Sequence, residues 1–368
     1  MNIINIEEKM SNQSPINENP INRNIISRNP TSRNPTNQRG YSILKNFQYN
    51  QFLGQDKNDI WRTLNNIDHL DLSISQDNLK DLGYKHQLIS AKLLEERMKL
   101  YETNCPKQIP PERCFIIRLD GNNFKKYTKA FCKPFDDNIV KAMIMTANNL
   151  LVKFNACTAY THSDEISLVF RIDNTSKTTN HIYNGRTTKL CSVLAGYCSV
   201  AFSKIILKFV NDEKSEYSTE QKAFINQSTP FFDARVVLFP KDNDMEITNY
   251  FVWRSSMDCY RNCITSYGHH HLGHQKLQGK KINQVIRLLS DAGITLDSIP
   301  LVLKQGIYCK KREYTETKTI NNEKQETYTR TRLFNFTFKV SYQDKYKDLL
   351  LSSLYNDDSR YSSEINTL

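Results

Sequence analysis

Two stretches decide the fold: Cys114-Phe-Ile-Ile-Arg-Leu-Asp-Gly-Asn-Asn-Phe124 and Tyr160-Thr-His-Ser-Asp-Glu-Ile-Ser-Leu-Val-Phe170. In each, acidic residues stand at the edge of an apolar run typical of a β-strand. Asp120 ends the first run, and Asp164 with Glu165 separates two others. Carboxylates that meet at strand ends form a natural site for Mg²⁺ and a nucleoside triphosphate.

Apolar periodicity predicts how the chain brings these residues together. It indicates strands at 114–119, 156–160, 166–171 and 232–239, a turn at 161–165, and helices at 137–154 and 189–210. The order β-α-β-β-α-β is that of a ferredoxin-like α+β fold. In this topology the turn between strands two and three lies at the edge where strand one ends. We therefore expect Asp120 and Asp164 to be neighbours, with Asp233 and Arg235 close by.

Composition divides the 368 residues into five parts. The Asn-rich segment 1–50 contains a near-repeat of Ser-Arg-Asn-Pro and predicts a disordered tail. Residues 51–84 are polar and weakly periodic, which indicates a poorly structured lead-in, although a helix starts near residue 85. We expect an ordered α+β domain at 85–240, helices and a β-hairpin that extend it at 241–345, and a loose tail at 346–368.

Net charge indicates the class of partner, and cysteine usage indicates the cellular compartment. The net charge of +11 favours a polyanionic partner such as RNA, DNA or a membrane surface. The nine cysteines are scattered without a CxxC pair, which indicates reduced thiols in an intracellular protein. The most apolar stretch, 191–202, is too short to span a bilayer, so we expect no membrane. We predict a cytoplasmic protein; the acid-free, basic stretch 19–51 leaves a mitochondrial location as the alternative.

The paired carboxylates suit phosphoryl transfer. Two such groups can hold two Mg²⁺ ions about 4 Å apart, and Asp120 with Asp164 fits that role. Gly121 permits a sharp turn that would aim its carbonyl at a metal. The amides of residues 122–124 could cradle phosphates, since they precede a helix-like segment. Each motif alone is ordinary turn sequence, but both in one β-α-β-β-α-β unit of a basic chain favour a nucleotide site.

Four motifs in the same order resemble the tRNA-His guanylyltransferase family, which polymerises nucleotides in the 3′-to-5′ direction. The resemblance covers about residues 85 to 345. The motifs are Arg118-Leu-Asp-Gly-x-Asn-Phe124, Lys133-Pro-x-Asp-Asp137, Ser163-Asp-Glu165 with Phe170, and Phe232-Asp-x-Arg-Val236.

This resemblance implies a polymerase-type palm, two Mg²⁺ ions, GTP and ATP as substrates, tRNA as partner, and a homo-oligomer, either a tetramer or a dimer. Chemistry would be attack by a nucleotide 3′-hydroxyl on an activated tRNA 5′ end. The implied catalytic residues are Asp120, Asp164 and Glu165. The implied metal ligands are Asp120, Gly121 and Asp164. The implied nucleotide-binding residues are Asp120, Gly121, Asn122, Asn123, Phe124, Lys125, Lys133, Ser163 and Asp164.

Departures from the family pattern refine the expected activity. The family has His-Ile-Asn-Asn after Asp-Cys, whereas here Asp258-Cys259 is followed by Tyr-Arg-Asn-Cys. This form resembles the guanylyltransferase-like branch that repairs or edits tRNA 5′ ends by template-directed addition. We therefore predict 5′-end repair, with strict addition of one G to tRNA-His as the alternative. The candidate RNA-binding residues are Arg261, Asn262, His274 and Lys280.

Other interpretations remain open. A nucleotide cyclase can use a similar palm, and a catalytically silent RNA-binding protein could keep the fold. The run Gly268-His-His-His-Leu-Gly-His274 suggests zinc, but its spacing matches no paired-ligand pattern, so a polar loop is favoured. The Lys310-Lys-Arg312 run is either a phosphate contact or, as we prefer, a solvated strand.

Overall fold

The computed structural model describes residues 83–103, 106–172, 180–241, 243–320, 324–355 and 366–367. All of them belong to the compact unit Leu64–Leu368. The predicted tail 1–50 and nearly all of the lead-in 51–84 lie outside the described residues.

One antiparallel sheet organises this unit. Its strands follow the order β4-β1-β3-β2-β5-β6-β7. The first four give the ferredoxin-like order, and the predicted α+β palm is confirmed. The strands are β1 (Phe115–Gly121), β2 (Thr158–His162), β3 (Glu165–Phe170), β4 (Phe232–Leu238), β5 (Ile307–Ile320), β6 (Lys324–Thr337) and β7 (Asn366–Thr367).

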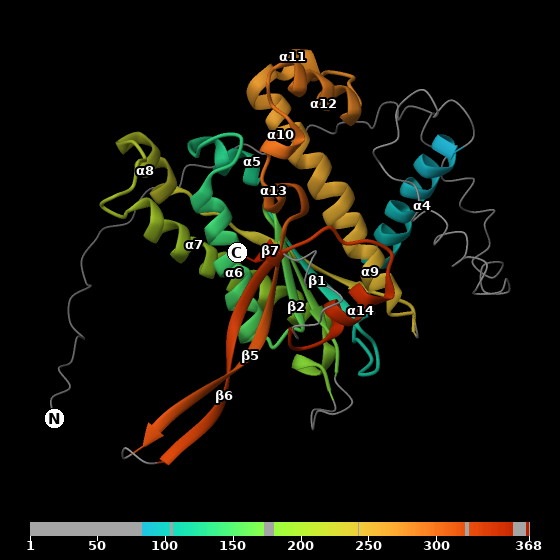
Figure 1. Cartoon of the computed structure of the whole chain (residues 1–368), viewed down its shortest axis with the longest axis vertical. Coiled ribbons are helices and arrows are strands. Elements are labelled where there is room, and N and C mark those ends of the chain that lie inside the picture. Colours follow the sequence, from blue (N-terminus) through green and yellow to red (C-terminus); the bar gives the residue numbers. More distant parts are fainter. Residues whose placement is uncertain are drawn as a thin grey trace, which may run out of the picture. The chain divides into compact units, whose positions relative to one another are not determined.

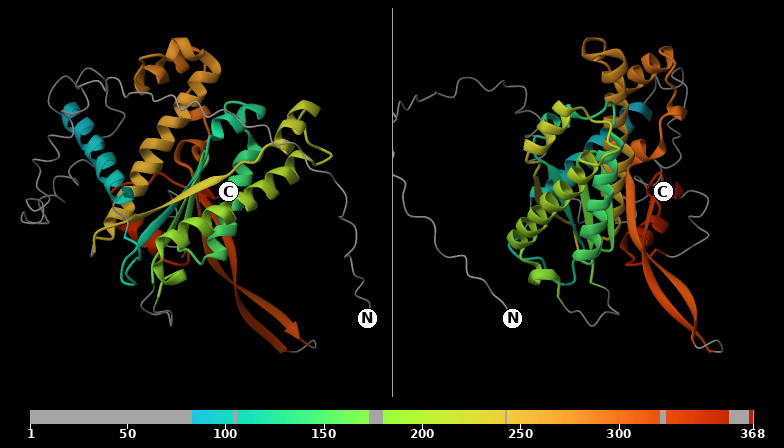
Figure 2. Two further views of the ribbon diagram at one scale, coloured as in Figure 1. Left: turned by 180° about the vertical axis from the view of Figure 1, so that it is seen from behind. Right: turned by 90° about the vertical axis from the view of Figure 1, so that its left-hand side faces the viewer.

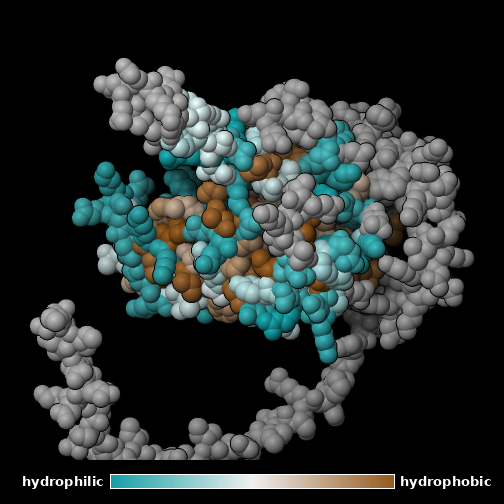
Figure 3. Space-filling view, turned by 90° about the horizontal axis from the view of Figure 1, so that it is seen from below, coloured by the Kyte–Doolittle hydropathy of each residue, from teal (hydrophilic) through white to brown (hydrophobic). Residues whose placement is uncertain are grey.

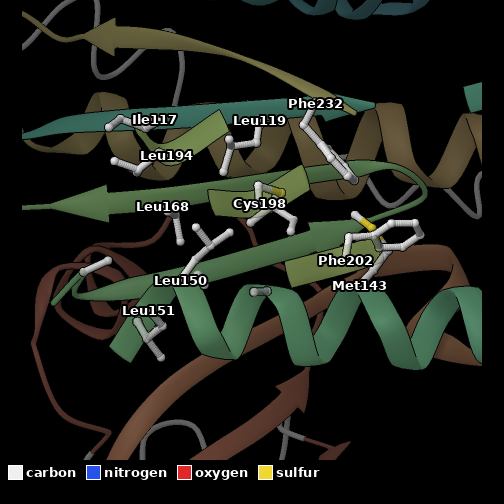
Figure 4. Close-up of a cluster of buried hydrophobic side chains, with 14 of the residues drawn as sticks. Ile117, Leu119, Met143, Leu150, Leu151, Leu168, Leu194, Cys198, Phe202 and Phe232 are labelled. Atoms are coloured by element: carbon white, nitrogen blue, oxygen red, sulfur yellow. The ribbon is translucent and has the colours of Figure 1, made fainter. Parts of the chain in front are cut away.

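Two long helices cover one face of this sheet (Figure 1). They are α6 (Asp137–Lys153) and α7 (Thr187–Val210). The side chain of Asp136 caps α6 by accepting hydrogen bonds from the amides of Asn138 and Ile139. Figure 4 shows the apolar contact between helices and strands. Its members include Ile117, Leu119, Met143, Leu150, Leu151, Leu168, Leu194, Cys198, Phe202 and Phe232.

Helix α7 corrects one expectation about the membrane. Its 24 residues are long and apolar enough, by length and composition, to cross a bilayer. A single helix of this kind is weak evidence for a membrane span, because core helices of soluble proteins can have the same length and apolar composition. Here Leu194 and Phe202 are buried against the sheet. Apolar side chains also lie on the outer helix faces, with Met145, Val152 and Val200 exposed, and Figure 3 shows apolar residues gathered on one face of the molecule.

The opposite face of the sheet packs against a second helical layer, seen from behind in Figure 2. The sequence predicts one helix at 247–267; the structure has an α–π–α run of α9 (Met245–Phe251), η5 (Val252–Cys259) and α10 (Tyr260–Leu272). Helices α4 (Gly83–Thr103) and α14 (Asp344–Leu351) join this layer.

Helix α14 contradicts the loose tail expected at 346–368 for its first residues, up to Leu351, because Leu350 is fully buried. The remaining helices among the described residues are short. They are α5 (Phe124–Tyr127), η3 (Thr128–Ala130), η4 (Ile182–Gly185), α8 (Thr219–Gln227), α11 (His274–Leu277), α12 (Ile282–Asp291), η6 (Leu296–Ser298) and α13 (Leu301–Gln305). Helices α10 to α13 enclose a core of their own that includes Cys263, Val285 and Leu289.

Strands β5 and β6 form a long hairpin that extends beyond the helices (Figures 1 and 2). The prediction that residues 310–312 form a solvent-exposed strand is wrong for Lys310. Lys310 is completely buried, and its Nζ donates to the carbonyls of Cys157 and Ser352 and to Thr158 Oγ1 at 2.6–3.2 Å. The lysine thus ties the segment after α14 to strands β2 and β5.

Lys310 should make stability depend on pH. Burial lowers its pKa from 10.5 to about 7. Between these values the unfolded chain binds a proton that the folded chain lacks, so stability rises with pH. We expect the free energy of unfolding of the natural chain, relative to Lys310→Met, to increase by about 2 kcal/mol from pH 7 to pH 9. Urea titrations at both pH values measure it, with the exposed Lys339→Met as control; a constant difference would refute the assignment.

Candidate active site

The sheet brings Asp120 and Asp164 to one edge, as predicted. Asp120 faces Glu165 across β1 and β3, and Asp233 across β1 and β4. The Gly121 amide donates to the carbonyl of Asp164 at 3.0 Å. The turn itself is tighter than the expected 161–165, since β2 runs to His162 and β3 begins at Glu165. Ser163 takes a left-handed conformation, with φ of 50°.

Arginines surround this edge. Arg118 donates to Glu102 at 2.6 Å and to Asp120 at 3.2 Å, and its Nε lies 3.6 Å from Glu165. Arg235, placed near the edge as expected, lies 3.7 Å from Asp120. These contacts hold the Asp120 carboxylate at the end of β1.

The two aspartates nevertheless carry incompletely compensated negative charge. The pKa of Asp120 is raised by burial and by the charge of Glu165, against the opposing effect of Arg118. The pKa of Asp164 is raised by burial and by Asp120, against the hydrogen bond from Ser163 Oγ at 3.0 Å. A group whose ionised form is disfavoured in this way is stabilised by a bound cation.

A second cluster of titratable side chains lies beside the two aspartates, and the pKa values of its carboxylates shift in the opposite direction. Possible ligand atoms of His162, Glu165 and Asp258 all lie within 4.8 Å of one another. The Arg254 guanidinium is hydrogen-bonded to Glu165 and lies 3.1 Å from Asp258. Although burial alone would raise the pKa of Glu165, Arg254, His162 and Arg118 lower it. Burial is likewise outweighed at Asp258, whose pKa is lowered by His162, Arg254 and Arg261.

These opposite shifts indicate where a divalent cation fits. Arg254 already supplies positive charge between Glu165 and Asp258, so an ion there would have to displace a buried arginine. Asp120 and Asp164 have oxygen ligands of the kind that Mg²⁺ prefers and lack comparable compensation. The residues present therefore fit Mg²⁺ at the predicted pair, whereas Glu165 is engaged by arginines and would act on that pair from beside it.

A cavity of about 380 Å³ opens next to this edge. Lys125, Lys133, Ser163 and Asp164, all predicted nucleotide-binding residues, line it. Burial lowers the pKa of Lys133, partly offset by Asp136. The remaining wall is largely apolar, from α6 and α13 among others. A charged rim and an apolar wall suit a nucleotide, which has a phosphate chain and a base.

The loop after β1 corrects one part of the expectation. Asn122 was expected to turn its amide to phosphate, but this amide donates to the Phe231 carbonyl at 2.9 Å, because the chain continues beside β4. Asn122 and Asn123 keep exposed side chains, while Phe124 is buried. A metal-binding role for the Gly121 carbonyl stays a prediction.

Gly121 is required for a steric reason. A Cβ atom at this position would lie 2.4 Å from the Phe124 ring, which packs against Phe202 and Phe232. We expect Gly121→Ala to displace this loop and lower nucleotide addition at least tenfold, because misplaced catalytic groups lose rate steeply. Steady-state assays measure it. Gly196→Ala, where a Cβ would meet nothing within 4 Å, is the control; equal activity of both variants would contradict the prediction.

The predicted RNA-binding residues are not gathered at this site. Arg261 and Asn262 both donate to Asp258, although the Arg261 side chain is half exposed. His274 stacks on His269 with ring centroids 5.1 Å apart, and Lys280 is exposed on the helical module α10 to α13. Their RNA contacts stay predictions.

Sequence reasoning missed the roles of His162 and Arg254. The only local signal was the four-residue spacing of Arg254 and Asp258 on a predicted helix, which is common on solvated faces. The contact of Arg254 with Glu165, at the start of β3, depends on how the π-helix packs on the sheet.

Comparison with known proteins agrees with this architecture. A family model described as tRNAHis guanylyltransferase matches residues 95–240. The chain is similar to uncharacterized protein R259 of Acanthamoeba polyphaga mimivirus, with 36% identity over 278 residues, covering 73% of this chain and 93% of the relative. It is also similar to tRNA(His) guanylyltransferase of Saccharomyces cerevisiae, with 27% identity over 213 residues, 54% of this chain and 82% of the relative.

A solved structure supports the fold. A bacterial tRNA(His) guanylyltransferase (Thg1)-like protein in complex with ATP aligns with a TM-score of 0.51 and 24% identity, over 70% of this chain and 99% of that protein. The fold and the relatives define a nucleotidyltransferase with a polymerase-type palm. The chain belongs to the tRNA-His guanylyltransferase family, which confirms the resemblance seen in its motifs.

Proposed function

We propose that this chain adds guanylate to the 5′ end of tRNA, with GTP and ATP as its nucleotide substrates. The observation that carries the proposal is the meeting of Asp120 and Asp164 beside a cavity lined by Lys125 and Lys133. The named relatives are tRNA(His) guanylyltransferases, which favours the alternative of the two activities considered from the sequence.

The chain's own residues can prepare nucleotidyl transfer. Asp120 and Asp164 would hold two Mg²⁺ ions, which when bound supply charge neutralisation at phosphate and a lowered pKa of the attacking hydroxyl. Arg118 orients Asp120 through a 3.2 Å hydrogen bond. Lys125 and Lys133 would hold the phosphate chain as point charges. The apolar wall of the cavity would exclude water from the base.

Template-directed 5′-end repair is the second candidate. It rests on Arg261 and Asn262, which follow Asp258 in place of the family's His-Ile-Asn-Asn and donate to this carboxylate. Tyr260, in the position of the family's histidine, is half-buried.

One assay separates these activities. Purified chain is incubated with Mg²⁺, labelled GTP and either tRNA-His or a 5′-truncated tRNA of another type. Extension of tRNA-His by one nucleotide, without extension of the truncated tRNA, supports the proposal. Extension of the truncated tRNA to a length set by its opposing strand supports repair instead. A product formed from GTP alone would indicate a nucleotide cyclase. RNA binding without extension would indicate an RNA-binding protein that has no catalytic activity.

A further inference from the structure

His162 is the most unusual side chain of the cavity. It lies at the end of β2, directly before Ser163, and lines the same cavity as Lys133 and Asp164. The residue is only 7% exposed. Among the residues that the structure describes, neither of its ring nitrogens has a hydrogen-bond partner. A buried polar group without a partner costs about 1–3 kcal/mol, so such an arrangement calls for an explanation.

The neighbours of His162 do not supply the missing partner. Its Nε2 lies 3.8 Å from Asp258 Oδ2, close enough for an electrostatic interaction but beyond hydrogen-bond distance. Asp258 already accepts hydrogen bonds from Arg261 and Asn262 and pairs with Arg254 at 3.1 Å. The Tyr160 ring, 5.5 Å away between centroids, offers packing to the imidazole.

A bound metal ion is a poor explanation for the lack of hydrogen bonds at the His162 imidazole. It would have to share Glu165 and Asp258, and Arg254 is bound between these carboxylates. His162 also lines the cavity, where the proposed function places a nucleotide.

We propose that His162 hydrogen-bonds the nucleoside triphosphate bound in this cavity and thereby contributes to its affinity. This inference rests on the proposed function and deepens it. An imidazole has a donor and an acceptor within one rigid ring, so it can meet the edge of a base, a ribose hydroxyl or a phosphate oxygen. Burial keeps competing water away from the contact, which increases its contribution to nucleotide affinity.

The inference predicts that one substitution affects nucleotide affinity much more than stability. In His162→Phe the ring is kept and its polar atoms are removed. Without nucleotide, we expect the melting temperature of the variant to change little, because the loss of the electrostatic contact with Glu165 and Asp258 is offset by the removal of buried polar atoms that lack hydrogen bonds. Its affinity for GTP should fall about fivefold to tenfold, the effect of one lost hydrogen bond. A merely structural histidine would give lower stability and unchanged affinity.

The experiment measures equilibrium binding by calorimetry, with Mg²⁺ and without tRNA, for GTP, ITP and ATP. His162→Gln retains a donor and an acceptor and should bind GTP within about threefold of the natural chain. His269→Phe, an exposed histidine of α10 outside the cavity lining, is the matched control and should bind normally.

Each outcome decides something. If His162→Phe weakens GTP binding but not ITP binding, the contact is to the amino group of guanine. Equal weakening for all three nucleotides places the contact on ribose or phosphate, and both results support the inference. Unchanged GTP affinity in His162→Phe, or equal losses in the Phe and Gln variants, would overturn it. If the natural chain binds none of the three, the proposed function and this inference are both overturned.

Discussion

Asp164→Asn is expected to lower the rate of nucleotide addition by about a thousandfold or more, because the substitution removes a charged ligand whose electrostatic contribution is several kcal/mol. The fold should survive. The raised pKa of Asp164 shows that its negative charge is disfavoured by burial, so a neutral amide is tolerated without Mg²⁺.

Single-turnover assays with labelled GTP and tRNA measure the rate, and circular dichroism during heating measures stability. The exposed Asp212→Asn, in the loop after α7, is the matched control and should leave both unchanged. Nucleotide addition within tenfold of the natural rate would remove Asp164 from the proposed site. A large fall in melting temperature would mean that the residue has a structural role instead.

Arg254→Met should cause a large loss of stability. The arginine is 4% exposed, stacks on the Trp253 ring at 4.8 Å, and binds Glu165 and Asp258. Its removal leaves two largely buried carboxylates with less positive charge nearby, which costs about 3–5 kcal/mol. Urea denaturation at pH 7 measures this loss.

The pH dependence gives a second check on Arg254. Glu165 and Asp258 have lowered pKa values in the natural chain, so their ion pairs stabilise it above the unfolded pKa values, near 4. This stabilisation disappears as pH falls toward the depressed values. The difference between natural chain and variant should therefore be largest near pH 7 and smaller at pH 4. Arg261→Met, which removes a half-exposed partner of Asp258, should cost about 1 kcal/mol or less; an equal loss in both variants would contradict the prediction.

Local sequence patterns were sufficient to predict the edge of the sheet at which Asp120 and Asp164 meet. Alternating and continuous apolar runs predicted β1 to β4 within a few residues, and the right-handed crossover then required the end of β1 to meet the turn after β2. That rule placed Asp120 beside Asp164, although 44 residues separate them in sequence. Residue types also indicated the basic wall, since Lys125 and Lys133 flank the same loop.

Local patterns failed where a side chain's environment depends on distant elements. Lys310 belongs to a charged run, and no periodicity shows that strand β2 and the segment after α14 cover it. The tail 346–368 is polar on average, yet α14 buries Leu350 against the far face of the sheet. The Asn122 amide was taken as free because its partner, Phe231, is more than a hundred residues away.

The sequence by itself determined the order of strands and helices and therefore which acidic residues share an edge, because backbone periodicity and chain handedness act locally. Only the tertiary structure decided how charge is shared there. Arg254 reaches Glu165 because a π-helix packs on the sheet, and it pairs with Asp258 on the same helix, whereas burial outweighs the positive charge near Asp120 and Asp164. Coulomb interactions and desolvation depend on distances through space, and a linear sequence does not contain these distances.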